Sequence, residues 1–130
     1  MIKYQLNASL EQLEFTNLLR TAWPAFEVSH FDRMLASCAA YVCARADGDL
    51  IGFAKLISDG HQHGFVLDPV VAPIYQGNGV GSCLVKMLVE FACTAELTYL
   101  HVDFEPSLAP FYKSLGFKMT EAGLLHMGTA

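Results

Sequence analysis

The fold of this chain is decided by the stretch Val70-Val71-Ala72-Pro73-Ile74-Tyr75-Gln76-Gly77-Asn78-Gly79-Val80-Gly81-Ser82. The residues before it, 64–68, have the pattern of a buried strand, and residues 84–92 after it have that of an apolar helix. Three glycines within five residues therefore stand at a strand-to-helix junction. Glycine leaves backbone N–H groups uncovered, and the start of a helix favours negative charge. The sequence thus predicts a loop that binds a phosphorylated cofactor.

Periodicity and turn residues extend the prediction in both directions along the chain. Asp47-Gly48 between two β-rich runs indicates a hairpin. Ser9, followed three residues later by Gln12, is typical of the start of a helix, and Gly116 is typical of the end of one. The predicted strands are 3–7, 41–45, 50–57, 61–71, 98–103, 117–120 and 124–127, and the other helices are 9–20, 30–38 and 107–115. The order βααβββαβαββ predicts one mixed α/β (α+β) domain over residues 1–130, with helices on both faces of a central sheet.

Composition excludes several classes of protein. The formal charge is −5 and the eight Lys and Arg residues are scattered, which argues against nucleic-acid binding. No apolar run of about 18 residues is present, so we expect no membrane span. The N-terminus lacks the layout of a signal peptide, and we expect a cytoplasmic protein. An acidic balance suits a cationic small substrate such as an amine.

The four cysteines show no C-x-x-C spacing, so no metal site is predicted. Cys83 and Cys93 fall on the apolar helix, where a buried free thiol is the usual interpretation.

Spacing separates three kinds of phosphate-binding loop. A nucleotide P-loop requires a lysine directly after a glycine, and no glycine here is followed by lysine. The dinucleotide fingerprint G-x-G-x-x-G would need a glycine at Ser82. The third pattern, Q-x-x-G-x-G, is met by Gln76, Gly79 and Gly81. In this setting it resembles the GNAT superfamily of acyl-CoA N-acyltransferases, and the run from Pro110 to Phe117 resembles the second signature of that family.

The resemblance implies a set of cofactor contacts. The pyrophosphate of acetyl-CoA is expected on Gln76, Gly77, Asn78, Gly79, Val80, Gly81 and Ser82, and the pantetheine arm along the backbone of Val70 and Val71. A backbone N–H at or near Val71 is expected to stabilise the thioester oxygen, and Tyr112 to contact the cofactor and act as the general acid. The implied reaction is direct attack by the amine in a ternary complex.

The general base is less defined by the sequence. Asp68 is interpreted either as a base or ammonium-binding group or as a structural carboxylate. Asp59, His61 and His63 are further candidates at an expected β-turn, and His101 and Asp103 share a strand face with Tyr99. The acceptor pocket is expected near Trp23, Phe26, Glu27, His30 and Phe31.

The sequence favours an N-acetyltransferase that acts on a small primary amine. Two alternatives stay open, a non-catalytic acyl-CoA sensor and an acetyltransferase for proteins or peptides. The predicted apolar strands between Phe117 and Met127 would form an edge that pairs with a second copy, which suggests a homodimer.

Overall fold

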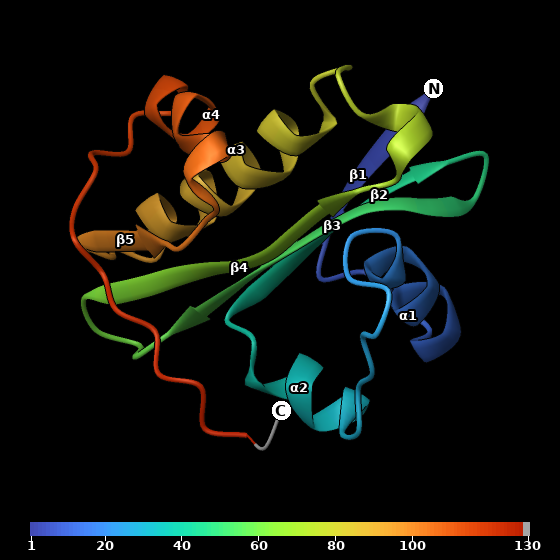
Figure 1. The fold of residues 1–130 in the computed structure, drawn as a ribbon, viewed down its shortest axis with the longest axis horizontal. Helices are drawn as coiled ribbons and strands as arrows, with labels where there is room; N and C mark the ends of the chain where they lie inside the picture. Colours follow the sequence, from blue (N-terminus) through green and yellow to red (C-terminus); the bar gives the residue numbers. More distant parts are fainter. Residues whose placement is uncertain (129–130) are drawn as a thin grey trace.

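A five-stranded mixed sheet forms the centre of the protein, shown by a computed structural model that describes residues 1–128 (Figure 1). The strands lie in sequence order, and all neighbours are antiparallel except the last pair, which is parallel. Their bounds are β1 (Ile2–Leu6), β2 (Ala40–Ala46), β3 (Asp49–Ser58), β4 (His63–Val71) and β5 (Tyr99–Val102). The predicted mixed α/β class is confirmed.

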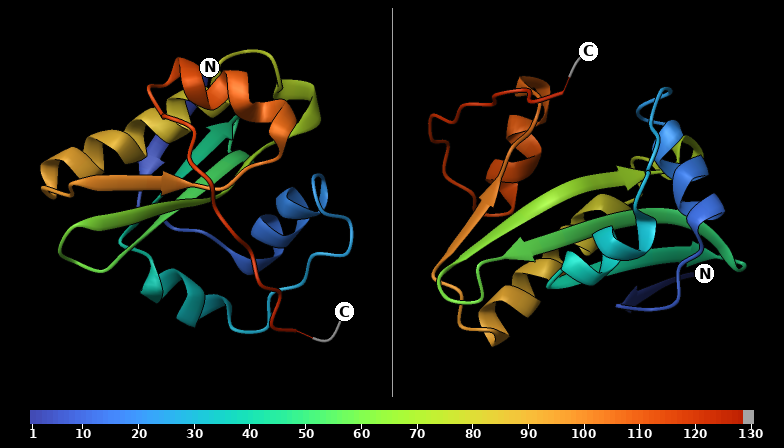
Figure 2. Two further views of the ribbon diagram at one scale, coloured as in Figure 1. Left: turned by 60° about the vertical axis from the view of Figure 1, so that its left-hand side comes forward. Right: turned by 90° about the horizontal axis from the view of Figure 1, so that it is seen from below.

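Helices cover both faces of this sheet, as predicted (Figure 2). One face carries α1 (Gln12–Arg20) and α2 (Phe31–Ser37). The other carries α3 (Val80–Thr94) and α4 (Ala109–Ser114). Short 3₁₀ turns at Pro73–Tyr75 and Pro106–Leu108 precede α3 and α4. None of the helices formed by residues 1–128 is long and apolar enough to span a bilayer.

The sheet separates two apolar cores. Under α3, Leu84 and Leu88 pack against the small and β-branched residues of the strands. Under α1 the core is aromatic, because Phe15 packs against Phe53 with ring centroids 4.9 Å apart. Gly52 brings α3 close to the sheet: a Cβ there would lie 3.1–3.2 Å from three neighbouring side-chain carbons. The glycine therefore sets the distance between β3 and α3, the helix that follows the glycine-rich loop.

Two turns that the sequence predicts are present in the structure. The β2–β3 hairpin turns at Asp47 and Gly48, whose φ angles of 50° and 88° are those of a type I′ turn. At the end of α4, Gly116 has φ 98°. Its N–H donates to the Lys113 carbonyl, and the Phe117 N–H donates to the Tyr112 carbonyl, which together form a Schellman motif.

The start of α1 differs from the prediction. The capping box is made by Glu11 and Glu14 in place of Ser9 and Gln12, and the Glu11 N–H donates to Glu14 Oε2 at 2.9 Å. Glu14 also forms an ion pair with Arg45 of β2 at 2.7 Å, and Arg45 donates to the Ser9 carbonyl. This contact between distant segments explains why the N-cap lies two residues later than the sequence alone suggests, at Glu11 and not at Ser9.

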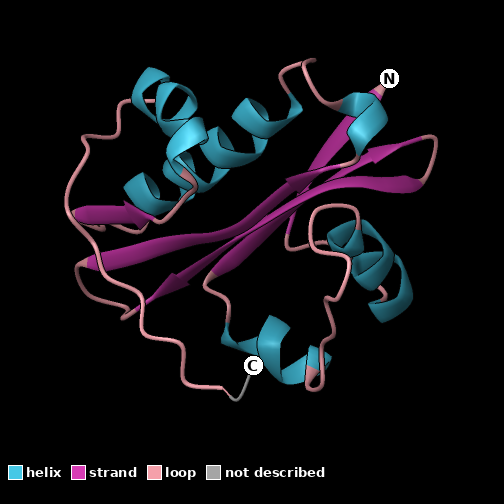
Figure 3. Ribbon diagram, in the orientation of Figure 1, coloured by secondary structure: helices cyan, strands magenta, loops and turns pink. Residues whose placement is uncertain are grey.

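The predicted strands 117–120 and 124–127 are not formed. The described residues after Gly116 contain neither helix nor strand (Figure 3), and Leu124, Leu125 and Met127 are 80–86% exposed. Their apolar runs are short and are separated by Glu121-Ala122-Gly123, and no strand of the sheet pairs with them. The edge on which the homodimer prediction rested is therefore not a strand.

Candidate active site

Two glycines shape the loop between β4 and α3. Gly77 and Gly79 have φ angles of 83° and 81°, in the left-handed region that side chains disfavour. Gly79 is the N-cap of α3, and its carbonyl accepts the first helical hydrogen bond from the Cys83 N–H at 3.1 Å. Apart from the adjacent residues of the chain, no atom of residues 1–128 lies within 4 Å of the position that a Cβ would take at either glycine. The outer side of the loop is therefore bare backbone.

The backbone of this loop presents a row of unused donors. Within residues 1–128, no protein acceptor receives a hydrogen bond from the N–H groups of residues 77–82. Two side chains of the loop form hydrogen bonds to its own backbone. Gln76 Nε2 donates to the Val71 carbonyl at 3.0 Å, and Asn78 Nδ2 donates to the Tyr75 carbonyl at 3.4 Å. Of the predicted phosphate contacts, the backbone N–H groups are free to bind, whereas the Gln76 amide is already used within the loop.

Beside this loop, the second half of β4 has one open edge. Pairing between β4 and β5 ends at Val66 and Val102, so no described strand pairs with residues 67–71 on that side. The Ala72 N–H donates to the Ile51 carbonyl, and by the alternation of an antiparallel ladder Val71 then points its N–H and C=O away from β3. Val70 points its own toward β3. Of the two predicted contacts for a pantetheine arm, only Val71 faces the open edge, where its N–H points outward and its carbonyl already accepts from Gln76 Nε2.

Tyr112 lies on α4 and is 3% exposed. Its ring stacks on Phe104 at 4.5 Å and meets Phe111 and Phe117 edge-on. Among the described residues, its hydroxyl has no hydrogen-bond partner, yet the oxygen is not fully enclosed. Burial raises the pKa of the phenol above its usual value of 10.0, so the hydroxyl keeps its proton at neutral pH. A protonated phenol with a free hydroxyl is suited to donate a proton.

Phe111 connects the two sequence signatures. A Cβ on Gly81 would lie 3.5 Å from Phe111 Cζ and 3.8 Å from Val71 Cγ2. The start of α3, the end of β4 and the residue next to Tyr112 therefore meet at one point. The fold brings the free N–H row, the open edge of β4 and the phenol into the same region of the molecule.

Asp68 sits in a bulge of β4. Its φ is 53°, a left-handed value that is unusual for a residue with a side chain, and the β3–β4 register shifts at this point. One carboxylate oxygen, Oδ2, is 3.0 Å from Lys55 Nζ. The Asp68 side chain is 36% exposed, while that of Lys55 is 12% exposed. Lys55 was not singled out by the sequence, because a lone lysine inside a strand carries no local signal.

These features match a known family along most of the chain. Residues 9–117 match the Acetyltransferase (GNAT) family. This chain belongs to the GNAT acetyltransferase family. The relatives of this GNAT chain include N-alpha-acetyltransferase RimI of Mycobacterium tuberculosis, 37% identical over 102 residues, which are 74% of this chain and 61% of that protein. An uncharacterized N-acetyltransferase of Pyropia yezoensis is 35% identical over 72 residues, which are 55% of this chain and 41% of that protein. The chain thus spans less than two thirds of these relatives.

Solved structures show the same fold over their whole length. A probable acetyltransferase of unknown function from Staphylococcus aureus superposes with a TM-score of 0.86 at 20% identity, and the match covers 99% of this GNAT chain and 100% of that one. A GNAT family protein from Streptococcus pneumoniae gives a TM-score of 0.85 at 21% identity, and the match covers 100% of both chains. At these identities the likeness concerns the fold alone.

The candidates for the base at the β3–β4 turn of this GNAT chain, Asp59, His61 and His63, lie far from the loop. Asp59 accepts hydrogen bonds from the backbone N–H groups of His61, Gln62 and His63, so it closes the β3–β4 turn. That turn stands at the opposite end of β4 from Val71, roughly 25 Å away for a strand of this length. The turn is therefore remote from the loop and from Val71, and a role for it at the acceptor stays a prediction.

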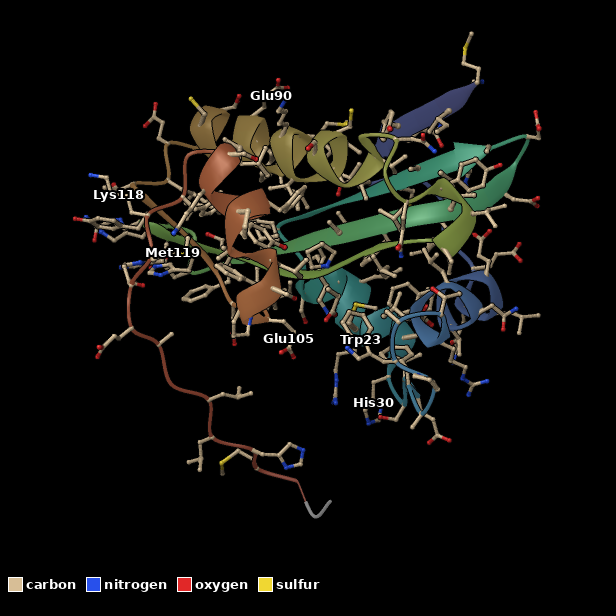
Figure 4. The ribbon with its side chains drawn as sticks, turned by 45° about the horizontal axis from the view of Figure 1, so that its top comes forward. Trp23, His30, Glu90, Glu105, Lys118 and Met119 are labelled. Atoms are coloured by element: carbon tan, nitrogen blue, oxygen red, sulfur yellow. The ribbon has the colours of Figure 1, made fainter. Side chains whose placement is uncertain are left out.

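The predicted acceptor residues divide between surface and core. Figure 4 labels Trp23, which is 45% exposed, and His30 near the segment that joins α1 and α2. A shallow pocket of about 280 Å³ beside α2 is lined by Glu27 and His30, among others. Phe26 and Phe31 instead pack on Phe15, with ring centroids 5.8 Å and 5.4 Å apart, and belong to the core.

The cysteines of α3 also differ from the prediction. Cys83 and Cys93 are exposed, because the sheet-facing positions of the helix are Val80, Leu84, Val85, Leu88 and Ala92. Cys43 is the buried thiol, and burial raises its pKa to about 11. Of these three cysteines, only Cys43 has the packing role that the sequence suggested.

Proposed function

We propose that this protein transfers the acetyl group of acetyl-CoA to a primary amine, with a small amine as the first candidate acceptor. The observation that carries the proposal is the row of unused N–H groups from Gly77 to Ser82, at the start of α3 and next to the open edge of β4. Such donors at a helix start bind phosphate oxygens. A pyrophosphate on this row and a pantetheine arm along Val71 would direct the thioester toward Tyr112.

Each step of the reaction has a residue to perform it. The Val71 N–H would donate to the thioester oxygen as it gains negative charge. Tyr112 would give its proton to the sulfur when the carbon–sulfur bond breaks, and the second proton that the attacking nitrogen loses as the amide forms would restore the phenol through water. Asp68 would bind the incoming ammonium and accept its proton through water, while Lys55 holds the carboxylate in place by the 3.0 Å ion pair. No acyl-enzyme is formed.

Proteins of the same fold support an acyl-CoA donor. An N-acetylglutamate synthase from Neisseria gonorrhoeae was crystallised with coenzyme A and N-acetyl-glutamate, and it superposes with a TM-score of 0.78 at 16% identity. The acceptor itself is not defined by such distant structures.

A polypeptide amino terminus is the second candidate acceptor. It is favoured by the 37% identity to RimI, whose name states that it acetylates an α-amino group. A half-exposed carboxylate at Asp68 is equally able to bind the ammonium of a small amine or that of a peptide.

Release of coenzyme A from acetyl-CoA tests the proposal. The purified protein is given small amines, polyamines and short peptides with free N-termini in parallel, and free thiol is measured. We expect release that depends on one acceptor class and falls when Tyr112 is replaced by phenylalanine. Tight binding of acetyl-CoA with no release for any class would indicate the sensor instead, and no binding at all would refute both.

A further inference from the structure

Two histidines form a hydrogen bond across the short parallel pairing of β4 and β5. His63 begins β4 and His101 lies within β5, and both side chains are on the sheet face opposite α3. Nδ1 of His63 lies 2.8 Å from Nε2 of His101, and neither nitrogen has another partner among residues 1–128. One of the two nitrogens donates its N–H to the lone pair of the other. The bond therefore exists only while at least one of these nitrogens carries no proton.

Aromatic neighbours hold both rings in this arrangement. The His101 ring stacks on Phe65 at 4.5 Å with 13° between the planes, and the His63 ring stacks on Tyr99 at 5.2 Å with 21° between them. The centroids of the two imidazoles are 5.1 Å apart. The stacks thus keep the two rings side by side, with the bonded nitrogens facing each other.

The number of protons on the pair decides whether the bond survives. With both rings neutral, the N–H of one ring donates to the lone pair of the other. A first added proton gives a charged donor and a neutral acceptor, which makes a stronger hydrogen bond. A second added proton leaves two N–H groups and two positive charges facing each other across 2.8 Å, so the bond is lost.

Both rings can take up these protons from solvent, since His101 is exposed and His63 is half-buried. Histidine is the side chain whose ordinary change of charge falls between pH 5 and 8. The second protonation of the pair therefore belongs to mild acid.

We propose that the His63–His101 bond is a proton-sensitive latch, which holds β5 against β4 near neutral pH and opens in mild acid when both rings are protonated. The pairing that it holds is the shortest in the sheet, because β4 and β5 share only four residue pairs, and the histidines belong to two of them. Within residues 1–128, no strand pairs with the other edge of β5. Repulsion between the two rings therefore acts on a strand with little other support.

The charged groups around the pair do not replace the lost acceptor. The Asp59 carboxylate accepts from the His63 backbone N–H at 3.0 Å, and its pKa is lowered, chiefly by the hydrogen bond from the His61 N–H. It therefore stays ionised in mild acid and favours positive charge on the pair, but its hydrogen bonds go to backbone N–H groups. The other titratable groups at this turn and on the same face of β3, β4 and β5 are His61, Tyr99, Asp103 and the ion pair of Lys55 with Asp68.

Opening of the latch would reach the candidate active site along the chain. After β5, the chain passes through the 3₁₀ turn Pro106–Leu108 into α4, which carries Tyr112. We therefore expect the segment that leads to the candidate acid to become more mobile in mild acid.

Hydrogen exchange of the purified full chain tests the latch. Peptides that cover residues 98–103 are compared with peptides from β2 and β3 at pH 7.5 and pH 5.0, after correction for the pH dependence of chemical exchange. If the closed pair holds one proton fewer than the opened strands, the equilibrium constant for opening rises by up to about tenfold per pH unit. We expect the β5 peptides to lose about tenfold in protection at pH 5.0, while the β2 and β3 peptides change little.

Two variants separate the latch from a general effect of acid. His101→Phe keeps an aromatic ring on Phe65 and cannot form the bond, so its β5 peptides should be equally protected at the two pH values. His61→Ala is the matched control, because it removes an exposed histidine two residues from His63 and should keep the wild-type response. Equal β5 protection of the wild type at both pH values, or a wild-type response in His101→Phe, would overturn the proposal.

Nuclear magnetic resonance of the wild-type protein labelled with nitrogen-15 needs no variant. A scalar coupling between His63 Nδ1 and His101 Nε2 reports the hydrogen bond directly. We expect this coupling at pH 7.5 and its loss at pH 5.0. Its absence at pH 7.5, or its persistence at pH 5.0, would contradict the latch.

Discussion

Replacing Gly79 by alanine separates the folding role of the loop from its binding role. At φ 81° an L-residue pays about 1–2 kcal/mol for the left-handed conformation. The new Cβ meets no protein atom within 4 Å, so it projects from the bare side of the loop, where the free N–H groups lie. If those N–H groups bind pyrophosphate, the methyl group disturbs one charge-assisted hydrogen bond of about 1.5–3 kcal/mol. We expect acetyl-CoA to bind roughly ten- to a hundredfold more weakly.

Gly48→Ala is the matched control for this variant. Gly48 has φ 88°, a Cβ there also meets no described atom within 4 Å, and it lies in the β2–β3 turn, outside the loop. Both variants should lose the same 1–2 kcal/mol of stability by thermal unfolding, about 3–10 °C for a chain of this size. Calorimetric titration with acetyl-CoA should then distinguish them. Wild-type affinity in Gly79→Ala, with the expected loss of stability, would refute the phosphate-binding loop.

Three further variants test other parts of the account. Tyr112→Phe keeps the ring stacked on Phe104 and removes a hydroxyl that has no partner among the described residues. The kcat for coenzyme A release should therefore fall about a hundredfold, while the melting temperature stays unchanged. Full turnover would exclude the acid role. Gly52→Ala places a carbon 3.1–3.2 Å from three neighbours and should cost about 1–3 kcal/mol in denaturant unfolding, whereas a neutral effect would mean that α3 shifts freely. The pKa of Glu14 is lowered, chiefly by its hydrogen bond to Arg45. The contribution of the ionised Glu14 to the stability of the folded state is therefore present above the ordinary glutamate pKa of about 4.3, and it is lost as the pH falls through the lowered pKa of the folded state. Glu14→Gln should consequently lose less stability on acidification than wild type. Parallel curves of unfolding free energy against pH for the two proteins would contradict this.

Features fixed by adjacent residues could be predicted from the sequence. The Asp47-Gly48 turn and the Gly116 helix end each depend on one left-handed backbone position that glycine supplies. The left-handed positions of the glycine-rich loop could be expected for the same reason, since Gly77 and Gly79 are close together in the sequence. Only the family resemblance indicated that Tyr112 would lie near that loop, to which Phe111 connects it.

Features that depend on distant residues could not be predicted. The helix α1 begins at the Glu11 cap and not at Ser9, because Arg45 binds Glu14 of the capping box from 31 residues further along the chain. The left-handed bulge at Asp68 and its ion pair with Lys55 arise from the β3–β4 register, which no local pattern encodes. The C-terminal apolar runs resembled strands because sequence periodicity does not show whether a partner strand is available.

The pairing of His63 with His101 is a further case of this kind. The alternation in β5 placed His101 on the same face as Tyr99, but the distance to His63 depends on the parallel register of two strands separated by a helix.

A crystal structure of the protein with acetyl-CoA would test the central claim most directly. The account predicts pyrophosphate oxygens within about 3 Å of the N–H groups between Gly77 and Ser82, and the thioester beside the Val71 N–H. A pyrophosphate bound anywhere else on the molecule would contradict it.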